Sequence, residues 1–167
     1  GQVVRVSKVK TRSHLHTSIL ETLDNLAIDN NDEIERIVFS TTLTTNLIAQ
    51  HQYPPTGLAL IPGPGIRPDW LKIGQINHLL DGSIDHRGRK ITSLDEKQVE
   101  ELVKDLVSNK VNDLAIIGKF STRNPLLEEN LQEIIEKSTN ITNIQLGNMI
   151  APRLNFPRRV HTTWLNT

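Results

Sequence analysis

The sequence predicts an α/β protein: a layered domain in which a mixed sheet is flanked by helices. Short apolar runs typical of buried strands alternate with segments whose apolar residues recur at the 3.6-residue period of a helix. The run "LAIIG" at 114–118 is a short continuous apolar segment of the kind found in parallel sheets. With 167 residues and no internal repeat or evident linker, the chain is expected to form one domain, residues 1–167.

The expected strands are rich in β-branched or other apolar residues and are bounded by polar or turn residues. They are residues 3–9, 34–39, 56–61, 114–118 and 141–146. The turn residues "PGPG" end the third strand, and most of the span 66–90 is expected to be irregular. Within that span, "DGSIDHRGRK" is interpreted either as a hairpin or as an exposed loop.

Five helices are expected from apolar stripes and from capping residues. Ser13 is expected to cap the first, whose stripe is Leu15, Ile19, Leu23 and Leu26, and the second begins near Thr42. The third is opened by a capping box of Ser93 and Glu96, with a stripe of Val99, Leu102, Val103, Leu106 and Val107. Asn124 is expected to cap the fourth, with Pro125 at its first position and Leu127, Leu131, Ile134 and Ile135 facing inward. The last is expected at 157–165.

Composition excludes several functional classes. Lys+Arg and Asp+Glu both total 19, so the net charge is zero and neither a nucleic acid nor an anionic membrane is expected as a partner. The absence of cysteine excludes disulfides, thiolate metal sites and a cysteine nucleophile. No apolar run is long enough to span a bilayer, so a cytoplasmic protein is expected.

A cluster of hydroxyl and amide side chains follows the strand expected at 34–39. Ser40, Thr41 and Thr42 come directly after it, and Asn46 lies one helical turn beyond Thr42. A strand that enters a helix through small polar residues presents free backbone N–H groups, which suit a phosphate or carboxylate oxygen. In open α/β sheets, ligands bind at this carboxyl end of the strands. The alternative is ordinary helix capping by Thr41 or Thr42.

Two further groups of residues are candidates for function. Arg158 and Arg159 can clamp a carboxylate or phosphate, but for the arginines alone a solvated helix face or an ion pair to another domain is the favoured explanation. His14 and His16 are two positions apart at a helix start and do not share a face, so no metal site is expected there.

Five stretches, in order, resemble the N-terminal domain of the hydantoinase/oxoprolinase family. "FSTTLTTNLIA" is similar to the family's His-Gly-Thr-Thr-x-x-Thr-Asn segment, and "GIRPDWLKIGQ" to its Gly-Phe-x-Asp-x-Leu-x-Ile-Gly stretch. "IDHRGRKITSLDEKQV" resembles the segment that leads into the following helix, and "STRNPLLEE" matches an Asn-Pro-x-x-Glu pattern. "NFPRRVHTTWLN" resembles the closing Glu-Tyr-x-Arg…Thr-Thr-x-x-Asn.

The resemblance implies an actin-like, sugar-kinase-like ATPase fold and an enzyme that uses ATP and Mg²⁺ to activate a cyclic amide, such as hydantoin or 5-oxoproline, for hydrolysis. Ser40, Thr41, Thr42 and Asn46 would then bind substrate, while Arg158 or Arg159 would stabilise negative charge or contact another domain. The expected partners are the remaining domains of the longer protein, with a second subunit left open.

Three departures from the family pattern keep a second interpretation open. The family's Asp-x-Gly-Gly-Thr phosphate loop is expected to precede "GQVVRV", so residues 1–167 alone are expected to bind no cofactor and to be inactive. Phe39-Ser40 replaces the family's His-Gly, and Asn155-Phe156 replaces its Glu-Tyr. The alternative is therefore a non-catalytic family member that serves as an assembly or regulatory domain.

Overall fold

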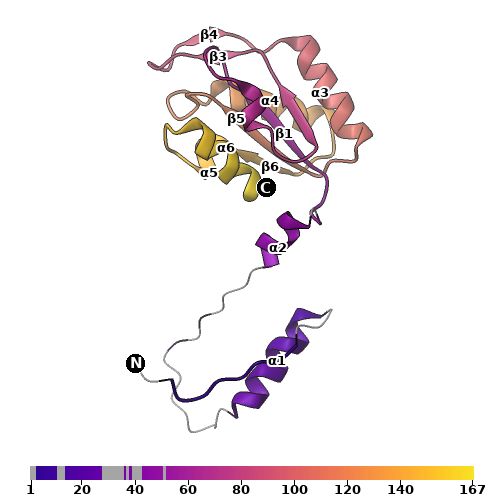
Figure 1. The fold of residues 1–167 in the computed structure, drawn as a ribbon. Helices are drawn as coiled ribbons and strands as arrows, with labels where there is room; N and C mark the ends of the chain where they lie inside the picture. The colour runs from indigo at the N-terminus through magenta and orange to yellow at the C-terminus, as the bar shows by residue number, and fades with distance from the viewer. Residues whose placement is uncertain (1–2, 11–13, 28–35, 37, 39–42, 51) are drawn as a thin grey trace. The chain divides into compact units, whose positions relative to one another are not determined.

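The computed structural model describes residues 3–10, 14–27, 36, 38, 43–50 and 52–167 (Figure 1). The chain divides into two compact units, Gly1–Thr42 and Leu43–Thr167. That residues 1–167 form a single domain stays a prediction.

The first unit contains helix α1 (Leu15–Leu26), which confirms the helix expected from the stripe of leucine and isoleucine. His14 precedes its first turn without a side-chain capping bond, and Ser13, the expected cap, lies outside the described residues. The helix ends at Ala27, which adopts a left-handed conformation and donates its N–H to the carbonyl of Asp24. Arg5 donates a side-chain hydrogen bond to the carbonyl of Leu26 (3.2 Å), so segment 3–10 lies against the end of the helix.

The strand expected at residues 3–9 is wrong, since no strand is assigned to residues 3–10. The side chains of Val3, Val4 and Val6 are 76, 86 and 81% exposed. A β-branched run forms a strand only where another strand pairs with it, and the described part of this unit contains none. Most of the strand expected at 34–39 lies outside the described residues, and the two described positions, Arg36 and Val38, are exposed and not in a strand.

The second unit is built on a four-stranded sheet with the order β2-β1-β5-β6, in which every pairing is parallel. These strands are β2 (Ile76–Leu79), β1 (Thr56–Ile61), β5 (Asp113–Gly118) and β6 (Asn143–Leu146). Antiparallel pairing occurs in a separate two-stranded sheet of β3 (Ser83–Ile84) and β4 (Lys90–Thr92). The predicted α/β class is confirmed, with a mainly parallel sheet flanked by helices (Figure 1).

Strand β2 lies in the span that was expected to be irregular. It has only four residues, all half-buried, and two of them are the polar Asn77 and His78. Because it lies at the edge of the sheet and pairs only with β1, it needs no long apolar run, which is why the sequence pattern missed it. The hairpin interpretation of "DGSIDHRGRK" is confirmed by the pairing of β3 with β4.

Helices cover both faces of the sheet and enclose two apolar clusters. Helices α3 (Glu96–Ser108) and α4 (Leu126–Ser138) pack on one face, and α6 (Phe156–Leu165) with the short 3-10 helix Pro68–Leu71 packs on the other. Side chains of β1 alternate between them: Leu58 and Leu60 point to α6, while Ala59 and Ile61 point to α3 and α4. Two shorter helices, α2 (Leu43–Ala49) and α5 (Gly147–Ile150), complete the unit, and α2 begins where the sequence predicted.

The expected capping box of α3 is wrong in its first member. Asp95, not Ser93, occupies the cap, and its carboxylate accepts the backbone N–H of Gln98 (3.0 Å). Either residue can cap, and the one directly before the first helical residue does so. Helix α4 begins at Leu126, one residue later than expected, with Pro125 at its cap position, and the side-chain oxygen of Asn124 accepts the N–H of Leu126 (3.1 Å) from one residue further back.

Candidate functional site at the carboxyl edge of the sheet

All four strands of the main sheet end at the same edge, because they are parallel. The loops after β1, β5 and β6 meet at this carboxyl edge. Lys119, just after β5, donates its backbone N–H to the carbonyl of Ile61 (2.8 Å) and its ammonium group to the carbonyl of Pro64 (2.8 Å). Ligands of open α/β sheets bind at this edge, which makes its polar groups the first candidates for a site.

Two buried charged residues hold the last residue of β5. The side chain of Glu128, at the start of α4, accepts the N–H of Gly118 (2.7 Å), and Arg159 of α6 donates to the carbonyl of Gly118 (2.6 Å). Glu128 and Arg159 are 0% and 1% exposed. Since α4 and α6 lie on opposite faces of the sheet, the two side chains tie both helical layers to one strand end. We call Glu128, Gly118 and Arg159 the edge clamp.

Glu128 also reaches the loop after β6. Its second carboxylate oxygen accepts the backbone N–H of Asn148 (3.0 Å). This approach needs glycine at position 147, because an added Cβ would lie 2.9 Å from Cγ2 of Ile117 and 3.1 Å from Oε1 of Glu128. The clamp therefore fixes the ends of β5 and β6 together.

Burial shifts the pKa of both charged residues in the clamp toward the neutral form. Burial raises the pKa of Glu128, and it is opposed by hydrogen bonds from the N–H groups of Gly118 and Asn148 and by the charge of Arg159. Burial likewise lowers the pKa of Arg159, opposed by the charge of Glu128. The opposite charges of Glu128 and Arg159 thus each counteract the effect of burial on the other.

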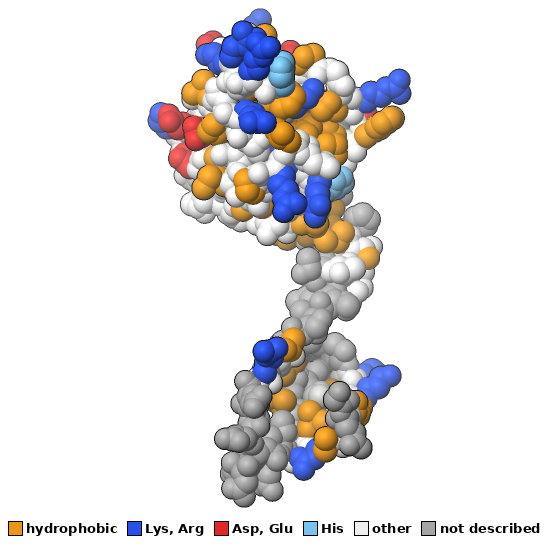
Figure 2. All heavy atoms as spheres, turned by 90° about the vertical axis from the view of Figure 1, so that its left-hand side faces the viewer, with side chains coloured by type: hydrophobic (Ala, Val, Ile, Leu, Met, Phe, Trp, Pro, Cys, Tyr) orange, Lys and Arg blue, Asp and Glu red, His pale blue; other side chains and the backbone are white. Residues whose placement is uncertain are grey.

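A hollow of about 290 Å³ lies beside the clamp, between the segment after β6 and helix α6. Three of its lining residues are arginines, Arg153, Arg158 and Arg159, and none is acidic. The remaining lining residues are Ile150, Ala151, Pro152, Asn155 and Thr162. We call this cavity the arginine hollow. Figure 2, viewed from the side on which α5 and α6 lie in Figure 1, shows basic side chains projecting from this face.

The structure brings Arg158 and Arg159 to one cavity and gives them different surroundings. Arg159 is buried and bonded to backbone carbonyls, while Arg158 is exposed at the rim. Ser40, Thr41 and Thr42 lie outside the described residues, and Asn46 is an exposed residue of α2. Among the described residues, Asn46 does not line the arginine hollow.

Sequence reasoning missed Arg153, and it placed Glu128 in the Asn-Pro-x-x-Glu pattern without assigning it a role. A signal for Glu128 was present, because it falls three and seven positions before Leu131 and Ile135, on the buried stripe of α4. A carboxylate on an apolar stripe must find donors. Arg153 lies in an irregular segment, where periodicity carries no information.

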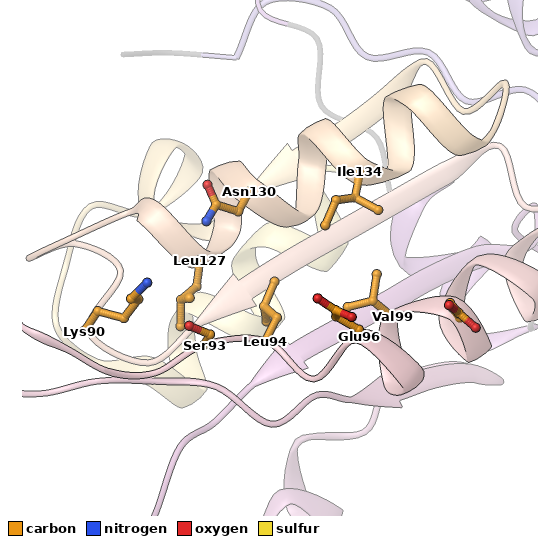
Figure 3. Close-up of a pocket in the computed structure, with 9 residues that line it drawn as sticks. Lys90, Ser93, Leu94, Glu96, Val99, Leu127, Asn130 and Ile134 are labelled. Atoms are coloured by element: carbon orange, nitrogen blue, oxygen red, sulfur yellow. The ribbon is translucent and has the colours of Figure 1, made fainter.

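A second cavity, of about 380 Å³, lies between α3 and α4 (Figure 3). Leu94, Val99, Leu127 and Ile134 form its apolar part, with Lys90 toward one end and Glu96 toward the other (Figure 3). Each charged side chain that lines it is exposed, so no buried polar group is fixed against its wall. The arginine hollow is therefore the better candidate for a built polar site.

The glycine-containing turn after β1 uses the carbonyl of Pro64 to accept a hydrogen bond from Lys119, and it does not lead into an α-helix that could cradle phosphates. Within the described ranges, no three His, Asp or Glu side chains gather in a way that could hold a metal ion. No helix in those ranges has the length and apolar character needed to cross a membrane.

The fold and its edge define an α/β domain with a parallel sheet and a charged, buried clamp at the carboxyl ends of its strands. The family model of the hydantoinase/oxoprolinase N-terminal region matches residues 1–139, and the chain belongs to this family. The resemblance seen in the sequence is thereby confirmed. No match was found among curated proteins.

Solved structures share the fold. The chain is similar to the ATP-dependent caprolactamase from Pseudomonas jessenii, with a TM-score of 0.69 and 17% identity over 99% of this chain and 28% of that one. It is also similar to a nucleotide-free acetone carboxylase, with a TM-score of 0.63 and 17% identity over 89% of this chain and 26% of that one. The chain thus spans between a quarter and a third of the length of these proteins.

Proposed function

We propose that the chain is the N-terminal region of an enzyme that uses ATP to activate and hydrolyse a cyclic amide, such as hydantoin or a 5-oxoproline-like compound. The match of the family model to residues 1–139 carries this proposal. The similarity in fold to an ATP-dependent caprolactamase over 99% of the chain supports it. A cytoplasmic location, a role in hydantoin utilization and an actin-like ATPase fold for the longer protein are parts of the same proposal.

In this proposal Ser40, Thr41, Thr42 and Asn46 lie on the substrate side and hold substrate oxygens with hydroxyl, amide and backbone donors. ATP and Mg²⁺ would be held by other parts of the longer protein, where the family's phosphate loop is expected. The remaining domains of that protein, and where required a second subunit, would complete the active site.

The test is ATP hydrolysis by the full-length protein in the presence of hydantoin, 5-oxoproline and caprolactam, each added separately. We expect at least one cyclic amide to stimulate release of ADP in step with ring opening. If all three amides leave ATP turnover at its unstimulated level and no ring-opened product forms, the proposed hydrolysis of cyclic amides is wrong.

The role of the hydroxyl cluster is tested with Thr42→Val in the full-length protein. Valine keeps the branched shape of threonine and removes the hydroxyl. If the hydroxyl meets developing charge, turnover falls roughly 10²-fold while the melting temperature changes little. If it only caps a helix, the variant loses about 1 kcal/mol of stability and keeps normal turnover once folded.

A second candidate function, an assembly or regulatory domain, is favoured by the structural roles of two residues that depart from the family pattern. Asn155 caps α6 by accepting the N–H of Arg158 (3.1 Å), and Phe156 is buried in the cluster under α6. The fold therefore accommodates the loss of the family's Glu-Tyr pair. In the ATP assay, this function predicts no amide-dependent turnover although the longer protein still assembles with its partners.

A further inference from the structure

The arginine hollow combines a cavity with an excess of fixed positive charge. Its lining contains three guanidinium groups and no carboxylate. Among the described residues, the guanidinium groups of Arg153 and Arg158 form neither an ion pair nor a hydrogen bond. The charge of Glu128 acts on Arg159, but Glu128 does not line the hollow, so the exposed Arg153 and Arg158 have no carboxylate beside them there.

Arg159 gives the hollow a rigid wall. Its two terminal nitrogens donate to the carbonyls of Arg153 (2.6 Å) and Gly118 (2.6 Å), and its guanidinium lies 5.6 Å from the centre of the Phe156 ring. Carbonyl oxygens satisfy hydrogen-bond donors but do not neutralise a full charge. The Nε of Arg159 is buried and has no hydrogen-bond partner, which leaves this side chain, 1% exposed, incompletely satisfied.

The rest of the rim is arranged around this buried charge. The bond from Arg159 to the carbonyl of Arg153 holds the backbone of Arg153 against α6. Arg158 and Thr162 are one helical turn apart in α6 and share a face. The side chain of Asn155 already caps the first turn of α6, so the helix N-terminus is not the feature that attracts a ligand here.

We propose that the arginine hollow binds one small oxyanion, a carboxylate or a phosphate group. The exposed guanidinium groups of Arg153 and Arg158 contact its oxygens with paired N–H donors, and the hydroxyl of Thr162 adds a neutral donor. The buried charge of Arg159 attracts the anion without needing to move. This inference concerns binding by the described residues and is independent of the proposed function.

The test is isothermal titration of the whole chain with inorganic phosphate and, separately, with acetate at constant ionic strength. We expect saturable one-to-one binding of at least one of the two, in the millimolar range or tighter. Saturation by phosphate alone assigns the hollow to a phosphate group, and saturation by acetate assigns it to a carboxylate. If neither anion saturates, the proposal is overturned.

Variants locate the binding. Arg153→Gln and Arg158→Gln should each weaken binding roughly tenfold, the effect of losing one charge-assisted contact. Arg158→Lys keeps the charge but loses the planar fork, and it should weaken binding by a smaller factor. Arg123→Gln removes an exposed arginine that follows β5 and does not line the hollow, so binding should change less than twofold. Equal weakening by Arg123→Gln and Arg158→Gln would show only a general effect of charge and would overturn the proposal.

Discussion

The body of the main sheet and its carboxyl edge are stabilised by different interactions. In the body, the side chains buried between the sheet and helices α3 and α4 form an apolar cluster that includes Leu102, Leu114 and Leu131, all 0% exposed. At the edge, Glu128 and Arg159 are equally buried but charged, and they bond the two backbone groups of Gly118. One region is held by non-directional burial and the other by directed hydrogen bonds.

The difference shows where this fold needs positional accuracy. Apolar packing tolerates small shifts, because its energy follows the area removed from water. Two hydrogen bonds of 2.6 and 2.7 Å to one residue fix its carbonyl and N–H in place. Burying two charged side chains costs free energy that burying apolar side chains of similar size does not. Such an arrangement is therefore expected where a site must be held in a single geometry.

The largest effect is expected from Arg159→Met. Methionine keeps much of the length of the side chain but leaves Glu128 without a nearby positive charge and two carbonyls without donors. Leaving a buried hydrogen-bonding group without its partner costs roughly 1–3 kcal/mol for each group, and this variant leaves two carbonyls unpaired. Urea denaturation measures this loss, with the exposed Arg158→Met as a matched control expected within about 0.5 kcal/mol of the wild type. Equal losses in the two variants would contradict the clamp.

The body of the sheet is tested with Leu131→Ala, which creates a cavity under α4. We expect a loss of about 3 kcal/mol, in the range found for buried leucines. Since no titrating group is removed, the loss measured by urea denaturation should be the same at pH 5 and pH 8. A loss that changed with pH would show that the body and the edge are coupled.

The sequence predicted the body of the fold far better than its edge. Strand β1 was predicted with its observed bounds and β5 within one residue, because a buried strand between two helical layers must be apolar along its length. Edge strand β2 was missed because half of its residues are polar. Arg159 was a candidate from the sequence, but its bond to Gly118, 41 positions away, could not be predicted from local patterns. Valines at 3–9 gave the opposite error, because β propensity does not supply a pairing strand.

A smaller effect, dependent on pH, is expected from Glu128→Gln. The amide group has only one acceptor oxygen for the two N–H groups that Glu128 bonds, so the variant should lose about 1–3 kcal/mol. Because burial raises the pKa of Glu128 above its ordinary value of 4.5, the folded state binds the proton more tightly than the unfolded state. The stabilisation that this tighter proton binding gives the folded state is fully present below about pH 4.5, and it is lost as pH rises through the folded-state pKa of Glu128.

The stability advantage of the wild type over Glu128→Gln should therefore be largest in acid and decrease toward neutral pH. Urea denaturation from pH 4 to pH 8 measures the difference between the two proteins at each pH. Glu129→Gln, an exposed neighbour on the same turn, serves as the control and should show no such trend. An advantage that grew with pH would mean that the ionised carboxylate, and not the protonated form, stabilises the clamp.

The smallest effect separates two candidates for the cap of α3. Asp95→Ala removes the carboxylate that accepts the N–H of Gln98, and it should cost about 1 kcal/mol. Ser93→Ala removes the hydroxyl of the capping box expected from the sequence, and because that side chain makes no capping bond, it should cost less than about 0.5 kcal/mol. Thermal unfolding of both variants beside the wild type gives the comparison. The start of α3 is held by one local hydrogen bond, from the N–H of Gln98 to the carboxylate of Asp95. A larger loss of stability for Ser93→Ala than for Asp95→Ala would instead support the capping box expected from the sequence.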